Sequence, residues 1–221
     1  MAHAELAVPA LTGPVVDKAS IMSRRYEERL SNYIRDLFES TGNQLQVLTV
    51  PSLEGESIEG YSIRVVDEWK LGDKEKDNGV LFLVAVQDRR MRIEVGQGLE
   101  GDLTDLQAGR IIDGVKPFFR RNEFDAGINF AIKNIANAIG GDPSAAPRVK
   151  RRAKKVRWLD MIFLIIFLIL FLRRIFFFRG WGGRSSHYGG WSSGGGGWSS
   201  GGGGWSGGGG GFSGGGSSGS W

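Results

Sequence analysis

Residues 91–105 read M-R-I-E-V-G-Q-G-L-E-G-D-L-T-D and change character twice. The first five residues alternate between apolar and polar side chains, which predicts a strand with one buried face. A turn with three glycines and several carboxylates follows, and Thr104 can then cap a helix that continues to about residue 119. Because glycines permit unusual backbone conformations and loops often carry function, this turn is a candidate site.

A second strand lies directly upstream of the first. Residues 79–86, G-V-L-F-L-V-A-V, are almost continuously apolar, which is typical of a strand buried on both faces. The polar turn 87–90 joins the two strands, so we expect them to pair as a hairpin. In a hairpin, the loop that enters the first strand (residues 73–79) and the loop that leaves the second (residues 96–105) lie at the same edge of the sheet.

Helical and strand patterns alternate through residues 14–142. The spacing of apolar side chains and the position of cap residues predict three elements before the hairpin and a last helix near residue 140. These are a helix from a Ser23 cap to Thr41 with Gly42 as its stop, a strand over 44–50, a helix over 57–71 ended by Gly72, and a helix from an Asp125 cap to Ile139. This order indicates an α/β fold, and we predict a three-layer α/β/α sandwich with helices on both faces of the sheet.

Oxygen-bearing side chains are concentrated in the two loops at the predicted sheet edge. They are Asp77, Asn78, Glu100, Asp102 and Asp105. Clustered carboxylate and amide oxygens suit a hard cation such as Ca²⁺ or Mg²⁺. The alternative is that Asp102 or Asp105 stabilises the start of the next helix, and that Asn78-Gly79 makes a turn. The sequence leaves both interpretations open.

Three glycines of the second loop, Gly96, Gly98 and Gly101, match the dinucleotide-binding pattern G-x-G-x-x-G. Glu100 and Asp102 would place negative charge against a pyrophosphate, and the pattern follows the third predicted strand instead of opening the domain. We therefore expect no nucleotide cofactor.

Histidine and cysteine chemistry is excluded from the predicted domain. The chain has no cysteine, and its two histidines, His3 and His187, lie near the N terminus and in the C-terminal tail. Thiolate catalysis, a Ser-His-Asp triad and histidine metal ligands are therefore excluded there. Any enzymatic activity would have to use carboxylates and a bound metal.

Charge is distributed unevenly along the chain. Residues 1–142 hold 17 Lys or Arg and 23 Asp or Glu, a net charge of −6, whereas residues 143–221 hold 11 Lys or Arg and 1 Asp, a net charge of +10. An acidic domain repels phosphate, so we expect no nucleic-acid partner. Basic residues beside an apolar run favour a membrane surface instead.

A linker and an apolar segment follow the predicted domain. Residues 143–157 are rich in Pro and Ala and then strongly basic. Residues 158–178 number 21, enough for a helix to span the roughly 30 Å apolar core of a bilayer. Arg173 and Arg174 would have to reach toward the headgroups. We predict a single transmembrane helix over this segment.

The tail, residues 179–221, consists mainly of Gly, Ser and aromatic residues. It contains a seven-residue repeat, W-S-S-G-G-G-G, that begins at Trp191 and again at Trp198. Such a composition cannot bury enough apolar surface to offset its backbone entropy, so we predict a disordered tail. The spaced aromatic residues could support weak multivalent contacts, or the tail could be a solvated product of repeat slippage.

Residues 1–13 form a separate N-terminal segment. They lack the apolar core of an intact signal peptide, but Ala2-His3-Ala4 fits the A-x-A remnant before a cleavage site. This interpretation predicts a single-pass protein of the cell membrane whose folded domain is extracytoplasmic (periplasmic). The basic residues before the apolar segment favour the opposite orientation, since positive charge tends to stay inside.

Several motifs resemble those of the TPM domain family. They are D-N-G-V-L from Asp77, R-I-E-V-G-Q-G-L-E-G-D-L-T-D from Arg92, Val15-Val16-Asp17 and Thr41-Gly42-Asn43-Gln44. The resemblance covers residues 14–140, and Gln97 replaces the aromatic residue that is common there. The apolar segment and the tail ending in S-G-S-W resemble YgcG-type bacterial members. The family also includes thylakoid-lumen proteins tied to photosystem II repair.

The resemblance implies a compact sandwich with divalent-cation binding at the acidic loops. It carries over as candidate metal ligands Asp17, Asp77, Asn78, Glu100 and Asp105. Ca²⁺ is expected over Mg²⁺, and Arg92 is expected to be a structural partner of a loop carboxylate.

The expected function is a membrane-anchored, cation-binding interaction or maintenance module of the cell envelope. Its expected partners are the lipid bilayer and an unidentified membrane or envelope protein. The alternative is a metal-dependent acid phosphatase, an activity attributed to plant relatives. Phosphoryl transfer usually needs cationic groups or a second metal, and neither is evident among the five candidate ligands. A third hypothesis makes the Gly/Trp tail the functional element.

Overall fold

A mixed five-stranded sheet forms the centre of the described part of the chain. The structure is a computed structural model, and it describes residues 5–149, 167, 170 and 215–221. The strands lie in the order β1-β2-β3-β4-β5, in which β1, β2 and β3 are parallel and β4 and β5 are each antiparallel to the preceding strand. Their bounds are β1 Val15–Asp17, β2 Gln44–Val50, β3 Gly79–Ala85, β4 Arg90–Val95 and β5 Gly216–Ser220.

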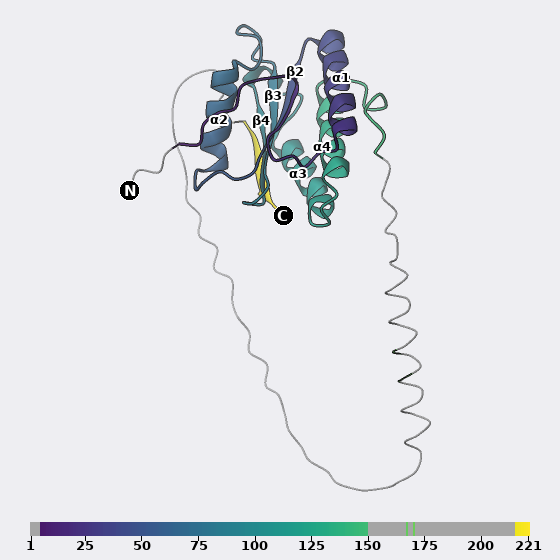
Figure 1. Cartoon of the computed structure of the whole chain (residues 1–221). Helices are drawn as coiled ribbons and strands as arrows, with labels where there is room; N and C mark the ends of the chain where they lie inside the picture. Colours follow the sequence, from purple (N-terminus) through teal and green to yellow (C-terminus); the bar gives the residue numbers. More distant parts are fainter. Residues whose placement is uncertain (1–4, 150–166, 168–169, 171–214) are drawn as a thin grey trace, which may run out of the picture. The chain divides into compact units, whose positions relative to one another are not determined.

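Helices cover both faces of this sheet (Figure 1). One face packs against α2 (Ile58–Trp69), and the other against α1 (Arg24–Thr41), α3 (Asp105–Phe119) and α4 (Phe124–Ala138). Alternate residues of β3 enter different apolar cores, since Leu81 belongs to the α2 side and Phe82 to the other side. The predicted mixed α/β fold with helices on both faces is confirmed.

The predicted hairpin is also confirmed. β3 and β4 pair with Val80 opposite Val95 and Ala85 opposite Arg90. Beyond this register the Gly96 amide donates to the Gly79 carbonyl at 2.8 Å, and a short 3-10 helix, Gln97–Leu99, follows. The loop that enters β3 and the loop that leaves β4 therefore lie side by side at one end of the sheet.

The predicted helix starts are confirmed for α1, α2 and α3. Ser23 precedes α1, and the hydroxyls of Ser57 and Thr104 each accept a backbone N–H at the start of α2 and α3. Gly42 ends α1 with a left-handed φ of 76°. α2 ends at Trp69, two residues earlier than predicted, because the left-handed conformation occurs already at the next residue.

The predicted Asp125 cap of the last helix is wrong. α4 begins at Phe124, and Asp125 lies in its first turn. The Asp125 carboxylate instead accepts hydrogen bonds from the Ser23 backbone N–H at 3.1 Å and from the Ser23 hydroxyl at 2.7 Å. Asp125 therefore joins the start of α4 to the start of α1.

The end of the predicted disordered tail forms a strand. β5 pairs with β4 from Gly216, opposite Glu94, to Ser220, opposite Arg90. The prediction of disorder is wrong for residues 215–221, because the edge of β4 supplies backbone partners and a packing surface that a Gly/Ser segment lacks on its own. The remaining tail residues, 179–214, lie outside the described residues.

Segments on both sides of the predicted domain contact it. Leu6 and Val8 pack on the α2 side, and the Trp69 indole N–H donates to the Pro9 carbonyl at 2.8 Å. After α4, Ala146 is buried against the α1 side of the molecule. The folded part therefore extends beyond residues 14 and 142.

The predicted transmembrane segment, residues 158–178, lies outside the described residues except for Phe167 and Leu170. These two residues are helical and exposed. Within the described part of the chain, no helix has the length and apolar character needed to cross a membrane.

Candidate functional site

Two glycines allow the loop before β3 and the loop after β4 to touch. A Cβ on Gly96 would lie 2.1 Å from the Asp77 carbonyl oxygen, and one on Gly98 would lie 1.7 Å from the Lys76 carbonyl oxygen. The Gly98 amide also donates to the Asp77 carbonyl at 3.2 Å. Close backbone packing thus explains why Gly96 and Gly98 are glycines, whereas a Cβ on Gly101 would have no heavy atom within 4 Å.

Asp77 lies at the junction of the two loops. Its φ of 46° is in the left-handed region, which aspartate tolerates better than most residues. Its amide donates to the Asp73 carbonyl at 2.8 Å, which closes the loop on itself. The side chain is half-buried.

Asn78 is a structural clamp in this fold. Its side-chain oxygen accepts the Asp73 N–H at 2.9 Å, and its amide nitrogen donates to the Gly42 carbonyl at 2.8 Å. The side chain is buried, with 7% of the residue exposed. These bonds join the loop before β3 to the end of α1, and Gly79 already belongs to β3, so Asn78-Gly79 does not form the turn that the alternative interpretation expected.

Replacing Asn78 by alanine is expected to lower the free energy of unfolding by about 2 kcal/mol, because the Asp73 N–H and the Gly42 carbonyl lose their partner. Urea unfolding of the full chain, followed by circular dichroism, measures this. The control is Asn32→Ala, which removes an exposed amide bonded to Arg35 and should change little. Equal stability of the two variants would contradict the assignment of Asn78 as a clamp between the loop before β3 and the end of α1.

Glu100 and Asp105 lie beside the C-terminal residues. Asp105 is in the first turn of α3, and its carboxylate accepts the Gly216 N–H at 2.7 Å. A Cβ on Gly215 would lie 2.5 Å from a Glu100 carboxylate oxygen. Thr104, and not Asp105, caps α3, but Asp105 lies in the first turn of this helix, where a carboxylate complements the helix dipole. Both carboxylates also line the place where β5 begins.

Asp17 lies at the opposite end of the sheet. It pairs with Thr49 near the end of β2, whereas Asp77 precedes the start of β3. Its carboxylate accepts the N–H groups of Ile21 at 3.2 Å and Met22 at 2.8 Å, and the Thr49 hydroxyl also donates to it. Asp17 is therefore separated from the acidic loops by the length of a strand, about 20 Å.

The five candidate metal ligands do not form one cluster. Asp77, Glu100 and Asp105 share one end of the sheet, but Asp17 lies at the other end and the Asn78 amide is already hydrogen-bonded. Among the described residues, no three carboxylate or imidazole side chains are grouped closely enough to hold a metal ion. A cation at this end would need backbone carbonyls and water to complete its shell.

β4 carries a buried ion pair that was not predicted from the sequence. Arg92 Nε lies 2.5 Å from Glu94 Oε2, and Glu94 is fully buried. The Ser62 hydroxyl of α2 donates to the same carboxylate oxygen at 2.8 Å. The signal in the sequence is the R-I-E alternation, which places Arg92 and Glu94 on the same face of the strand. The other Glu94 oxygen has no hydrogen-bond partner among the described residues.

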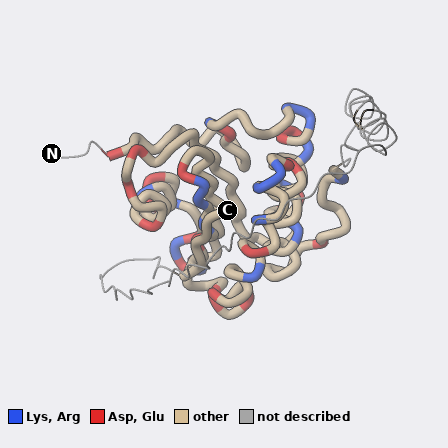
Figure 2. The backbone as a smooth tube through the Cα atoms, turned by 90° about the horizontal axis from the view of Figure 1, so that it is seen from below, with Lys and Arg blue, Asp and Glu red and all other residues tan. Residues whose placement is uncertain are grey.

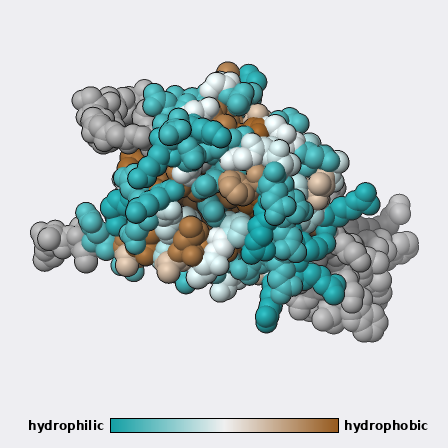
Figure 3. Space-filling model, turned by 90° about the horizontal axis from the view of Figure 1, so that it is seen from above, coloured by the Kyte–Doolittle hydropathy of each residue, from teal (hydrophilic) through white to brown (hydrophobic). Residues whose placement is uncertain are grey.

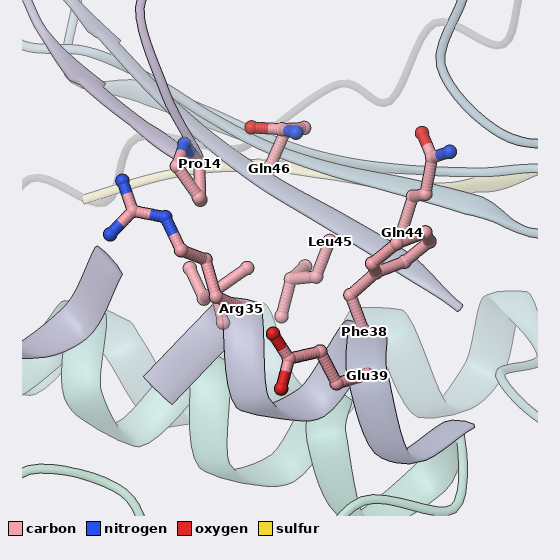
Figure 4. Close-up of a pocket in the computed structure, with 8 residues that line it drawn as sticks. Pro14, Arg35, Phe38, Glu39, Gln44, Leu45 and Gln46 are labelled. Carbon is pink, nitrogen blue, oxygen red and sulfur yellow. The ribbon is translucent and has the colours of Figure 1, made fainter. Parts of the chain in front are cut away.

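A pocket of about 260 Å³ lies between α1 and β2. Figure 4 shows Arg35, Phe38 and Glu39 of α1 on one side of it and β2 on the other, with Leu45 pointing toward α1 and the amide groups of Gln44 and Gln46 pointing away. Its volume is below the roughly 300–1,000 Å³ of ordinary small-molecule sites. The pocket is also separate from the acidic loops.

The loop end of the sheet is largely hydrophilic. Seen from above, the described surface carries separate hydrophobic patches among hydrophilic residues (Figure 3). Figure 2 shows acidic and basic residues interspersed over the described domain. This mixed surface fits a polar ligand better than an extended apolar one.

Comparison with known proteins identifies relatives of the folded part. A family model for the TPM domain matches residues 15–138. The solution structure of the N-terminal domain of a protein from P. gingivalis is 27% identical, with a TM-score of 0.55, and the match covers 63% of this chain and 89% of that one. The BA42 protein from Bizionia argentinensis is 19% identical, with a TM-score of 0.48, and the match covers 61% and 90% of the two chains. Among curated proteins, none matches this chain.

Proposed function

Since this chain belongs to the TPM domain family, we propose that it is a non-catalytic interaction module that binds a divalent cation at its acidic loops and is held at a membrane. The observation that carries the proposal is the β3–β4 hairpin, which brings Asp77, Glu100 and Asp105 to one end of the sheet. Carboxylates at one end of a rigid hairpin attract a hard cation, with Ca²⁺ favoured because it accepts irregular oxygen shells more readily than Mg²⁺ does.

A structural role, and not a catalytic one, is supported by the hydrogen bonds that two polar side chains at this end make. Asn78 holds two backbone segments together, and Asp105 holds the backbone of Gly216. These groups position chain segments, and none of them is paired with a base or a nucleophile in the manner of a catalytic site. The described residues also contain no histidine.

Membrane attachment is supported by the sequence of residues 158–178 and the basic residues before them. An extracytoplasmic location and an envelope partner remain predictions. The acid phosphatase alternative stays the competing hypothesis, and the experiment below separates the two.

Calorimetric titration of Ca²⁺ and Mg²⁺ into the full chain tests the proposal. We expect Ca²⁺ binding that becomes at least about tenfold weaker in Asp77→Asn and Glu100→Gln, because each change removes a charged ligand. The control is Asp36→Asn, the same chemical change on the exposed face of α1. Its affinity should match that of the unchanged chain.

The same proteins are assayed on p-nitrophenyl phosphate with and without the metal. Metal-dependent turnover that disappears in Asp77→Asn and Glu100→Gln would overturn the proposal in favour of the phosphatase. Absence of any binding heat would show that these carboxylates serve only the loop and the helix start.

A further inference from the structure

The edge of β4 binds residues 215–221 along their whole length. Beyond the five pairs of β5, the Val95 N–H donates to the Gly215 carbonyl at 3.1 Å, and the Trp221 N–H donates to the Arg89 carbonyl at 3.2 Å. The backbone ladder thus continues past both ends of the strand. Such bonds give affinity, while selectivity has to come from the side chains.

Close packing requires glycine at two positions of the docked strand. A Cβ on Gly216, whose φ is 118°, would lie 1.9 Å from the Ile93 carbonyl oxygen. A Cβ on Gly219 would lie 2.5 Å from the Ile112 side chain of α3. α3 in turn places Gly109 next to Ser217. This side of the edge therefore accepts only small residues.

Ser218 makes polar contacts on the other face of the strand. The Arg92 guanidinium donates to its hydroxyl at 3.0 Å. Burial alone would raise the pKa of Glu59 on α2, but a hydrogen bond from Ser218, a backbone hydrogen bond, and the charges of Arg92 and Arg90 outweigh burial and lower this pKa. Arg92 also contacts Glu94, so Ser218 meets a guanidinium that a buried carboxylate holds from its other side.

Trp221 anchors the end of the strand. Its ring meets the Phe119 ring edge-on, with centroids 4.8 Å apart and an interplanar angle of 75°. The indole packs against the apolar core on the α3 side of the sheet. Large aromatic anchors of this kind contribute most of the binding energy at many interfaces. Figure 1 shows the C terminus at the lower end of the sheet, and seen from below it projects over the middle of the domain (Figure 2).

We propose that the β4 edge, bounded by α2 and α3, is a docking site for an extended peptide of small residues followed by tryptophan, and that its occupant is residues 215–221 of the same molecule. The 65 residues from 150 to 214 can span a much greater distance than the one that separates α4 from β5. Docking within one molecule is also favoured over docking on a second copy, because the connecting chain keeps residues 215–221 at a high effective concentration near β4. Docking needs no cation, although Asp105, which accepts the Gly216 N–H, is also one of the proposed cation ligands.

If residues 215–221 dock on β4 of the same molecule, the possible arrangements of the chain in a membrane are restricted. Residues 5–149 and residues 215–221 then share one compartment. A single crossing by residues 158–178 would place the C terminus on the other side of the bilayer from β4. A docked C terminus and the predicted single-pass topology therefore exclude each other, and any membrane contact of residues 158–178 has to leave both segments on one side.

A designed disulfide tests the docking directly, because the chain contains no cysteine. Arg90 and Ser220 are exposed and lie opposite each other, at a spacing that suits a disulfide. We expect the full-length Arg90→Cys/Ser220→Cys variant to form an intramolecular disulfide on mild oxidation in detergent and in phosphatidylcholine–phosphatidylglycerol vesicles. Non-reducing electrophoresis and intact mass detect the product.

Two matched variants show whether the register is specific. Arg90→Cys/Ser217→Cys places the second cysteine opposite Ile93 and on the other face, so its disulfide should form at least about tenfold more slowly. Adding Gly219→Leu to the first pair should slow that pair by a similar factor, since the new side chain meets Ile112.

Equal rates for these variants would overturn specific docking. A disulfide-linked dimer as the main product would overturn the intramolecular assignment in favour of a second copy. Failure of the disulfide to form in vesicles, when it does form in detergent, would overturn docking at a membrane.

Discussion

Replacing Arg92 by methionine is expected to lower the free energy of unfolding by about 3–5 kcal/mol, the largest effect of any substitution considered for this chain. Glu94 is fully buried, and the substitution removes the guanidinium whose Nε lies 2.5 Å from its carboxylate. An uncompensated buried carboxylate is costly, because little solvent reaches it. Urea unfolding of the full chain, followed by circular dichroism, measures the change.

Two variants isolate the cause of this loss. Arg92→Met combined with Glu94→Leu removes both charges and should recover most of the lost stability. Arg24→Met breaks an exposed pair with Glu28, whose side chains are 91% and 65% exposed, and should change stability little. A double variant as unstable as Arg92→Met would contradict the ion-pair explanation and point to packing instead.

Replacing Gly96 by alanine is expected to cost about 3 kcal/mol, because the new methyl group would meet backbone atoms that cannot move independently. The nearest is the Asp77 carbonyl oxygen at 2.1 Å, followed by the Asp77 carbonyl carbon at 3.0 Å. Relief of this clash would separate the two acidic loops. Urea unfolding should therefore show lower stability, and calorimetry should show weaker Ca²⁺ binding.

The matched control lies five residues further along the same loop. A Cβ on Gly101 would have no heavy atom within 4 Å, so Gly101→Ala should leave stability and Ca²⁺ affinity nearly unchanged. If Gly96→Ala were as stable as Gly101→Ala, the close approach of the two loops would be contradicted.

The hairpin could be predicted because its signals are local. A continuous apolar strand, a polar four-residue turn and an alternating strand leave one reasonable pairing, and the structure has it. The same reasoning correctly placed the loops 73–79 and 96–105 beside each other. Local capping signals also placed the starts of the first three helices.

Asp17 could not be placed without the strand order. Its segment forms β1, which is parallel to β2 and β3, so the end of β1 lies with the ends of those strands. Asp77 precedes β3 and therefore lies at the other end of the sheet. A short strand with only three residues offers too little periodicity to be recognised, and its direction depends on long-range pairing.

The docked C terminus had no signal of its own. Glycine and serine are depleted in strands, and the pattern S-G-S-W resembles the preceding repeats. What makes these residues a strand is the shape of the site: the open edge of β4, the close approach of α3 at Gly219 and the Phe119 ring that receives Trp221. A prediction from composition describes only the segment and not the surface that it meets.

The most direct test of the proposed function is the amide proton–nitrogen NMR spectrum of the full chain during titration with Ca²⁺. If the acidic loops bind the cation, we expect saturable shifts confined to residues 73–79, residues 96–105 and the neighbouring Gly216, with none around Asp17. Shifts centred elsewhere, or no shifts at cation concentrations that saturate ordinary calcium sites, would contradict a cation-binding role for the acidic loops.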